Sequence, residues 1–229
     1  MKLGIMQPYF FPYIGYFQLM NAVDNFVVYD DVNYIKQGWV NRNRILLNNM
    51  EHIFTLNLLG ASSFKLINQI RTGNNKEKLL KTVDQAYAKA PFHMHAMPMI
   101  KELLLNEETN LSKYIINSII NIVKYLGITS NITISSEIEK NNELRGQEKI
   151  LHICKILRAD TYINAIGGMN LYSKEKFHRE GVELFFIKSN RVCYRQFENE
   201  FIPWLSIIDV MMFNPKERIK AMLDGFELI

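Results

Sequence analysis

Acidic, amide, guanidinium and indole side chains gather near the start of the chain. Asp30 and Asp31 end an apolar run, and the segment Trp39-Val-Asn-Arg-Asn-Arg44 begins eight residues later. An arginine fork binds phosphate or carboxylate through two parallel hydrogen bonds, and a carboxylate can orient that arginine or accept a proton. We therefore expect the catalytic residues to be Asp30, Asp31 and Arg42. The substrate-binding residues expected beside them are Trp39, Asn41, Asn43 and Arg44. Surface salt bridges between Asp31 and these arginines are the alternative.

An aromatic segment precedes these residues. Gln7-Pro-Tyr-Phe-Phe-Pro-Tyr-Ile-Gly-Tyr-Phe17 should form a loop after the first strand, and surface loops seldom carry so many rings. Prolines stiffen such a loop, glycine allows close approach to a ligand, and tyrosines offer hydroxyls as well as flat faces. The segment indicates a binding loop, unless its rings only pack over the core. Its candidate substrate-binding residues are Gln7, Tyr9, Tyr13, Gly15 and Tyr16.

Short polar and glycine-containing segments later in the chain also follow predicted strands. Ser135 and Ser136 follow one strand and Gly167-Gly168 follows another, so both should reach the same functional edge. Serines after strands also cap helices, and a glycine pair also makes turns, so each has a purely structural alternative. Arg145, just before a predicted helix, is a candidate anion ligand or a solvated surface residue.

The elements that must position these residues begin with a β-α-β unit. Residues 2–6 and 26–29 are apolar runs typical of buried parallel strands, and residues 15–23 between them can form two helical turns. Both strands then deliver their carboxyl ends to one edge of the sheet, where ligands bind in open α/β folds. The edge carries the aromatic segment on one strand and the two aspartates on the other.

The rest of the chain alternates between strand and helix patterns. A hairpin over residues 39–58, turning at Asn48-Asn49, and a strand at 66–71 precede helices at 76–90, 91–105 and 111–126, the last ending at Gly127. Further strands are predicted at 132–134, 161–164 and 183–187, and further helices at 147–157, 173–180, 205–212 and 215–223, with Pro215 in the first turn. We predict one α/β domain over residues 1–229, with a mostly parallel, doubly wound, Rossmann-like sheet, a helical insert and a helical C-terminal tail.

Composition narrows the classes of function. A net charge of +4, without a long run of like charges, does not indicate nucleic-acid binding and suits a phosphorylated small molecule. Two cysteines are too few for a disulfide framework, and neither they nor the histidines have metal-ligand spacing. We expect a cytoplasmic protein without a signal peptide or transmembrane segment, because the most apolar stretch, residues 114–128, is interrupted by polar residues. The sequence names no cofactor.

The sequence resembles the WbqC-like protein family. The likeness rests on the segments already described together with Asp30-Asp31-Val-Asn-Tyr34, Ser135-Ser136-Glu137, Leu171-Tyr172 and residues 201–209. It covers nearly the whole chain and adds Tyr172 to the candidate substrate-binding residues. The family is associated with bacterial O-antigen and other surface-polysaccharide gene clusters. The resemblance therefore implies a pathway rather than a reaction.

Three hypotheses follow for the function. The first is a transferase that passes an acyl or aminoacyl group to a nucleotide-linked amino sugar, with a small-molecule acyl donor or an acyl carrier protein as partner. The second is a nucleotide-dependent ligase or nucleotidyltransferase, because Tyr13-Ile-Gly-Tyr16 stands where such enzymes carry an HxGH motif. Both histidines of that motif are tyrosines here, and a phenol cannot supply the imidazolium charge that stabilises a transferring phosphate. The third is a non-catalytic binding component of a polysaccharide assembly complex.

Overall fold

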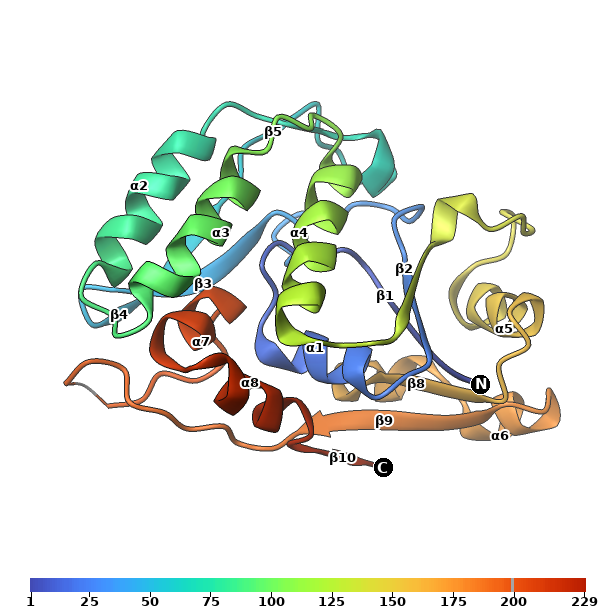
Figure 1. Cartoon of the computed structure of the whole chain (residues 1–229). Helices are drawn as coiled ribbons and strands as arrows, with labels where there is room; N and C mark the ends of the chain where they lie inside the picture. The colour runs from blue at the N-terminus through green and yellow to red at the C-terminus, as the bar shows by residue number, and fades with distance from the viewer. Residues whose placement is uncertain (199) are drawn as a thin grey trace.

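A six-stranded sheet forms the centre of the computed structural model, which describes residues 1–198 and 200–229 (Figure 1). The strands are β1 (Lys2–Met6), β2 (Asn25–Val28), β7 (Asn131–Ile134), β8 (Thr161–Ala165), β9 (Glu183–Ser189) and β10 (Phe226–Leu228). Their spatial order is β10-β9-β8-β1-β2-β7, and all pairs are parallel except β9 with β10. The chain thus builds outward from β1 to β7 and then returns to the opposite side of β1 with β8. The fold is mixed α/β with a mostly parallel central sheet, as predicted.

The strands form where the sequence offers short, continuous apolar runs. Such runs suit strands buried on both faces, and β2 is buried at every position. Met6 pairs with Val28, and Val28 pairs with Ile134, so the carboxyl ends of β1, β2 and β7 lie level with one another. The residues that follow these three strands therefore begin from the same edge of the sheet.

Helices cover both faces of the sheet (Figure 1). Phe26 and Val28 pack into one hydrophobic cluster with α1 (Ile14–Asn21), α4 (Leu111–Leu126), α7 (Ile207–Phe213) and α8 (Lys216–Leu223). Ile5 and Val27 pack into a second cluster with α5 (Gly146–Ile156) and α6 (Lys174–Arg179). The side chains of β2 alternate between the two clusters, as the pleat of a strand requires.

A long insertion joins β2 to α4. It contains the hairpin β3 (Arg42–Leu47) and β4 (Met50–Thr55), the short pair β5 (Leu58–Leu59) and β6 (Arg71–Thr72), the 3-10 helix η1 (Ile67–Gln69), and the helices α2 (Lys76–Tyr87) and α3 (His93–Leu105). Two further 3-10 helices, η2 (Ser135–Glu137) and η3 (Ile166–Leu171), follow β7 and β8 directly. Figure 1 shows α2 and α3 beside the β3–β4 hairpin, away from α5 and α6.

Most predicted elements are confirmed within a few residues. The hairpin turns at Asn48 and Asn49, which both have left-handed backbones with φ of 51° and 63°, and Gly127 ends α4 with φ of 74°. The strand predicted at residues 66–71 is wrong, because Ile67–Gln69 forms η1 and only Arg71 begins β6. The Gln69 side chain accepts a hydrogen bond from the Leu66 amide at 3.1 Å, and this local contact favours the turn over a strand.

The tail differs from its prediction in two details. Pro215 precedes α8 as its N-cap rather than lying in the first turn. A short strand, β10, follows α8 and closes the sheet edge against β9 in antiparallel register. Its three residues, Phe226–Leu228, are too few to show a periodic pattern.

A buried carboxylate ties the C-terminal helices to the insertion. Asp209 in α7 is fully buried and accepts hydrogen bonds from the Tyr194 hydroxyl at 2.6 Å, the Gln196 amide at 2.7 Å and the Tyr87 hydroxyl at 2.9 Å. The Tyr87 oxygen also accepts from the Leu46 amide in β3 at 3.0 Å. Burial raises the pKa of Asp209 to about 6, although its three donors oppose the shift.

The raised pKa of Asp209 makes the protein more stable at acidic pH than at neutral pH. Because the folded-state pKa lies above the ordinary value of 3.8, the folded protein binds the proton more tightly than the unfolded chain does. The stabilisation is complete below pH 3.8 and is lost as pH rises through about 6. We expect Asp209 to favour folding by about 1 kcal/mol more at pH 5 than at pH 7.5. Urea unfolding of the wild type and Asp209→Asn at both pH values measures this difference. A stability difference between the two proteins that is the same at both pH values would contradict it.

Candidate functional site

Asp30 locks together the ends of two neighbouring strands. Its carboxylate follows β2, is 3% exposed, and accepts hydrogen bonds from the Ser136 amide at 2.9 Å and the Ser136 hydroxyl at 2.8 Å, just after β7. Ser112 in α4 donates a third hydrogen bond at 3.3 Å, and Asn68 in η1 donates a fourth at 3.4 Å. Four segments of the chain thus meet on one carboxylate, which leaves Asp30 in a supporting position.

A cavity of about 600 Å³ opens beside this junction, and we call it the basic pocket. It lies at the carboxyl ends of β2 and β7 and at the start of α5. Its lining consists of Tyr29, Asp31, Val32, Asn33, Leu66, Ser136, Lys140, Asn142, Arg145, Gly146, Lys149, Ile150 and Tyr172. Residues from the β-α-β unit, the insertion and the second half of the sheet all contribute to it.

The charged groups of the basic pocket are three cations and one carboxylate. Asp31 forms ion pairs with Lys140 at 2.9 Å and with Lys149 at 3.3 Å, and the two lysine side chains are only 1% and 5% exposed. Burial by itself raises the pKa of Asp31, but the Ser135 hydroxyl and the two ammonium groups outweigh that effect and lower it overall. Asp31 therefore stays ionised, and the pocket keeps a net positive charge once Arg145 is counted.

The start of α5 adds further positive potential to the same wall. Arg145 has an extended backbone and Gly146 a left-handed one with φ of 52°, so the chain turns sharply into the helix at the pocket. The first amides of a helix lack intrahelical acceptors, and the side chain of Arg145, the N-cap residue, does not cap those of α5. The guanidinium of Arg145 also donates to the backbone carbonyls of Asn142 and Leu144. Helix dipole, amides and cations together suit a phosphate group.

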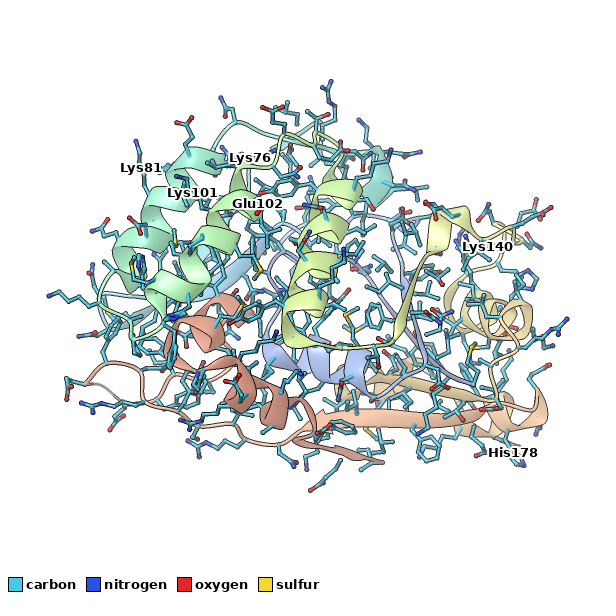
Figure 2. The ribbon with its side chains drawn as sticks, viewed as in Figure 1. Lys76, Lys81, Lys101, Glu102, Lys140 and His178 are labelled. Carbon is cyan, nitrogen blue, oxygen red and sulfur yellow. The ribbon has the colours of Figure 1, made fainter. Side chains whose placement is uncertain are left out.

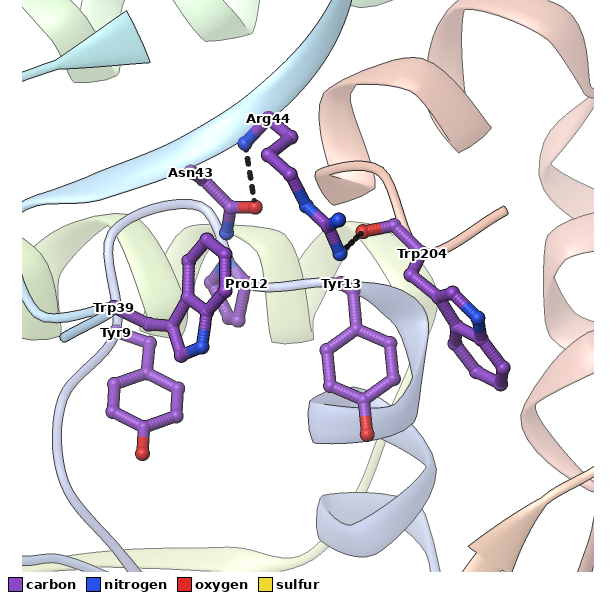
Figure 3. Close-up of a pocket in the computed structure, with 7 residues that line it drawn as sticks. All are labelled: Tyr9, Pro12, Tyr13, Trp39, Asn43, Arg44 and Trp204. Carbon is purple, nitrogen blue, oxygen red and sulfur yellow. Dashed lines mark hydrogen bonds between the residues drawn. The ribbon is translucent and has the colours of Figure 1, made fainter. Parts of the chain in front are cut away.

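A second cavity, of about 270 Å³, lies where the aromatic loop meets β3, and we call it the aromatic pocket (Figure 3). Its lining consists of Tyr9, Pro12, Tyr13, Trp39, Asn43, Arg44 and Trp204. The Arg44 guanidinium lies 5.2 Å from the centre of the Trp39 ring and donates to the Trp204 carbonyl at 3.2 Å. Arg44 also forms an ion pair with Glu51 at 2.9 Å.

Short-range contacts shape the loop that carries the two tyrosines of the aromatic pocket. The Asn43 amide donates to the carbonyls of Phe10 at 3.0 Å and Phe11 at 2.8 Å, which fixes the loop against β3. A Cβ atom on Gly15 would lie 2.3 Å from the Tyr13 ring, so only glycine lets that ring lie across the first turn of α1. These contacts hold the Tyr13 ring beside Trp204, with 5.9 Å between the ring centres.

Comparison with known proteins places this architecture in a family. The profile of the WbqC-like protein family matches residues 7–221. The chain belongs to the WbqC-like protein family. It is also 26% identical over 221 residues to the uncharacterized protein Rv1507c of Mycobacterium tuberculosis, with 93% of each chain covered. No solved structure shows significant similarity to it.

In this WbqC-like protein, the predicted site residues fall into three groups. The basic pocket contains Asp31, Ser136, Arg145 and Tyr172. The aromatic pocket contains Tyr9, Tyr13, Trp39, Asn43 and Arg44. The remaining predicted residues line neither pocket and are Gln7, Gly15, Tyr16, Asp30, Asn41, Arg42, Ser135, Gly167 and Gly168. The structure thus divides the predicted site between two cavities.

Several residues of the third group are buried or make hydrogen bonds within the protein. The Tyr16 hydroxyl is buried and donates to the Gln7 carbonyl at 3.1 Å. The Asn41 side chain is also buried, accepting from the Tyr34 hydroxyl at 2.7 Å and donating to the Leu56 carbonyl at 2.8 Å. Arg42 turns back to donate to the carbonyls of Gln37 and Gly38. Ser135 is fully buried at the start of η2.

Sequence reasoning missed Lys140, Lys149 and Trp204. Lys149 stands four residues before the buried Ile153, so helical spacing placed it on the apolar side of α5 and could have identified it. Lys140 reaches Asp31 from an irregular segment that carries no periodic signal. Trp204 lies in a loop and is one of only two tryptophans in the chain, the other being Trp39.

Among the described residues, no cluster of histidine, cysteine and acidic side chains could hold a metal ion. In the same part of the chain, no helix is long and apolar enough to cross a membrane.

The glycine pair after β8 provides a test of how tightly the pocket wall is packed. A Cβ on Gly168 would lie 2.5 Å from the Asn164 amide nitrogen and 3.3 Å from the Tyr172 ring, whereas one on Gly167 would meet nothing within 4 Å. We expect Gly168→Ala to cost about 1 to 3 kcal/mol in unfolding free energy. The matched control Gly167→Ala should stay within about 0.5 kcal/mol of the wild type. Urea unfolding measures both, and equal effects would contradict the packing.

Proposed function

We propose that this WbqC-like protein acts in bacterial surface-polysaccharide biosynthesis as a transferase on a nucleotide-linked sugar. The observation that carries this proposal is the basic pocket, where Lys140, Lys149 and Arg145 surround a cavity at the start of α5. A diphosphate presents several anionic oxygens within a small volume, and clustered cations with uncapped helix amides bind such groups well. The polysaccharide pathway comes from the family resemblance.

The topology supports a ligand at this place. The strand order reverses between β1 and β8, with α1 and α4 on one face of the sheet and α5 and α6 on the other. In Rossmann-like folds, ligands bind beyond the carboxyl ends of the strands near such a reversal. We propose that the fold is of this doubly wound type. The basic pocket takes residues from beyond β2, β7 and β8, at the carboxyl edge of the sheet that flanks this reversal.

The transfer step that fits this site is acylation of a sugar amine. The amine nitrogen attacks the acyl carbonyl carbon of the donor, the bond to the donor's leaving group breaks, and the amine loses a proton. We propose Asp31 as the acceptor of that proton, because its carboxylate lines the basic pocket and is kept ionised beside Lys140 and Lys149. Asp30 is unsuited, since four donors already occupy its carboxylate. The acyl donor is a small thioester or an acyl carrier protein.

The geometry offers less support for a nucleotidyltransferase of the HxGH type. Tyr16 is buried and its hydroxyl is bound to a backbone carbonyl, while Tyr13 lines the aromatic pocket. Neither tyrosine is among the residues that line the basic pocket. Two hydroxyls placed in this way do not converge on a phosphate in the basic pocket.

Arg145 provides the direct test of diphosphate binding, because its side chain is exposed and its loss should not disturb folding. We expect Arg145→Ala to weaken binding of uridine or thymidine diphosphate sugars about 10- to 100-fold, since a charge-assisted hydrogen bond contributes about 1.5 to 3 kcal/mol. Isothermal titration calorimetry measures the affinity. The matched control is Arg179→Ala, an exposed arginine in α6 that forms an ion pair with Glu175.

Two results would contradict the proposal. Unchanged affinity in Arg145→Ala would show that the diphosphate does not bind in the basic pocket. Binding without any acylated sugar product, for every thioester donor assayed by mass spectrometry, would favour a non-catalytic binding component of an assembly complex instead.

A further inference from the structure

The aromatic pocket brings together both tryptophans of the chain. Trp39 lies in the loop before β3, and Trp204 lies in the segment before α7, yet both rings line one cavity (Figure 3). Their exposed fractions are 38% and 48%, which is high for the largest and most costly aromatic side chain to leave in water. The Tyr13 ring lies between them, the Tyr9 ring lies on the other side of Trp39, and both tyrosine hydroxyls point the same way (Figure 3). The cavity is therefore a set of flat apolar faces open to solvent.

Trp204 is held in this position against its backbone preference. Its φ is 63°, in the left-handed region that bulky residues rarely adopt. The Gln196 side chain clamps the loop on one side, accepting from the Ile202 amide at 2.7 Å and donating to Asp209 at 2.7 Å. Arg44 clamps it on the other side through the Trp204 carbonyl. Strained backbones that are fixed from several sides are concentrated at ligand sites.

The polar groups of the pocket narrow the chemistry of its ligand. The Arg44 Nε atom is buried and has no hydrogen-bond partner among the described residues, so it can donate to a ligand oxygen. The positive charge of Arg44 makes the cavity unsuitable as an aromatic cage for a cation. Both hydrogens of the Asn43 amide are already bound to the Phe10 and Phe11 carbonyls, so this amide cannot donate to the edge of a nucleobase.

We propose that the aromatic pocket binds one pyranose ring of a glycoside. A pyranose presents C–H faces that pack against indole and phenol rings, and hydroxyl edges that accept from a guanidinium. The cavity volume of about 270 Å³ suits one such ring rather than an extended oligosaccharide. This inference rests on the proposed function only in choosing a sugar as the substrate class. The aromatic pocket itself is distinct from the basic pocket and shares no lining residue with it.

Intrinsic fluorescence reports directly on this site, because the chain has no tryptophan outside it. The probes are the methyl glycosides of glucose, galactose, mannose, rhamnose and N-acetylglucosamine, with uridine and adenosine as nucleobase controls. We expect at least one glycoside to change the fluorescence saturably, with a Kd on the order of 1 to 10 mM for so small a ligand. Uridine and adenosine should leave it unchanged.

A glycine variant separates binding from folding. Trp204→Gly removes the ring and places a glycine in the left-handed backbone, so we expect the midpoint of thermal unfolding to stay the same. The affinity for the glycoside, measured by calorimetry, should fall at least about 10-fold. Arg145→Ala should bind the glycoside as the wild type does. If Arg145→Ala binds the glycoside normally, then any change, or lack of change, in its affinity for nucleotide sugars concerns the basic pocket alone.

The inference is overturned by any of three outcomes. These are no saturable response to any of the methyl glycosides, a response to the nucleosides but not to the glycosides, or unchanged glycoside affinity in Trp204→Gly. Each can occur whether or not Arg145 governs nucleotide-sugar affinity, so this inference and the proposed diphosphate site can fail separately.

Discussion

The four hydrogen bonds to the Asp30 carboxylate are the constraint on which the basic pocket depends. They join the end of β2 to the segments after β7, to α4 and to η1, and so connect both sides of the long insertion to the sheet. Asp31, the next residue, is thereby aimed into the cavity toward Lys140 and Lys149. Removing an acceptor that satisfies several buried donors costs more than the bonds themselves contribute, because each donor is left unpaired. The position of Asp31 therefore follows from the structural role of Asp30.

Two buried lysines on one carboxylate leave a net positive charge in the basic pocket. Lys140 and Lys149 share the single Asp31 carboxylate, and burying a charge is unfavourable unless it is paired. The diphosphate of the proposed function would supply an anionic partner, and its binding would then stabilise this edge of the sheet. The aromatic pocket differs in its lining, which consists mainly of apolar ring faces with one partly buried guanidinium. The basic pocket is suited to an anionic group, and the aromatic pocket is suited to a ligand with a flat apolar face.

Local sequence patterns predicted most of the sheet and most helices, because strands buried on both faces leave short continuous apolar runs and helices leave an apolar stripe of helical period. The same reasoning placed Asp31 and Ser136 at one edge, since residues that follow parallel strands meet there, whereas Arg145 was a candidate only because it precedes a predicted helix. It could not foresee that Arg42 would turn back to its own loop carbonyls, because that choice depends on the path of residues 37–38. Nor could it bring in Trp204, whose approach to Trp39 is set by the packing of α7 and the Asp209 network. Contacts between loops that are distant in the sequence produce no periodic pattern of residues, so the sequence alone does not reveal them.

A crystal structure of the protein with a uridine or thymidine diphosphate sugar tests the central claim most directly. We expect the diphosphate in the basic pocket, within hydrogen-bond distance of Arg145 and of the first amides of α5, and near Lys140 or Lys149. A diphosphate bound anywhere else on the molecule, with the basic pocket filled only by solvent, would contradict it.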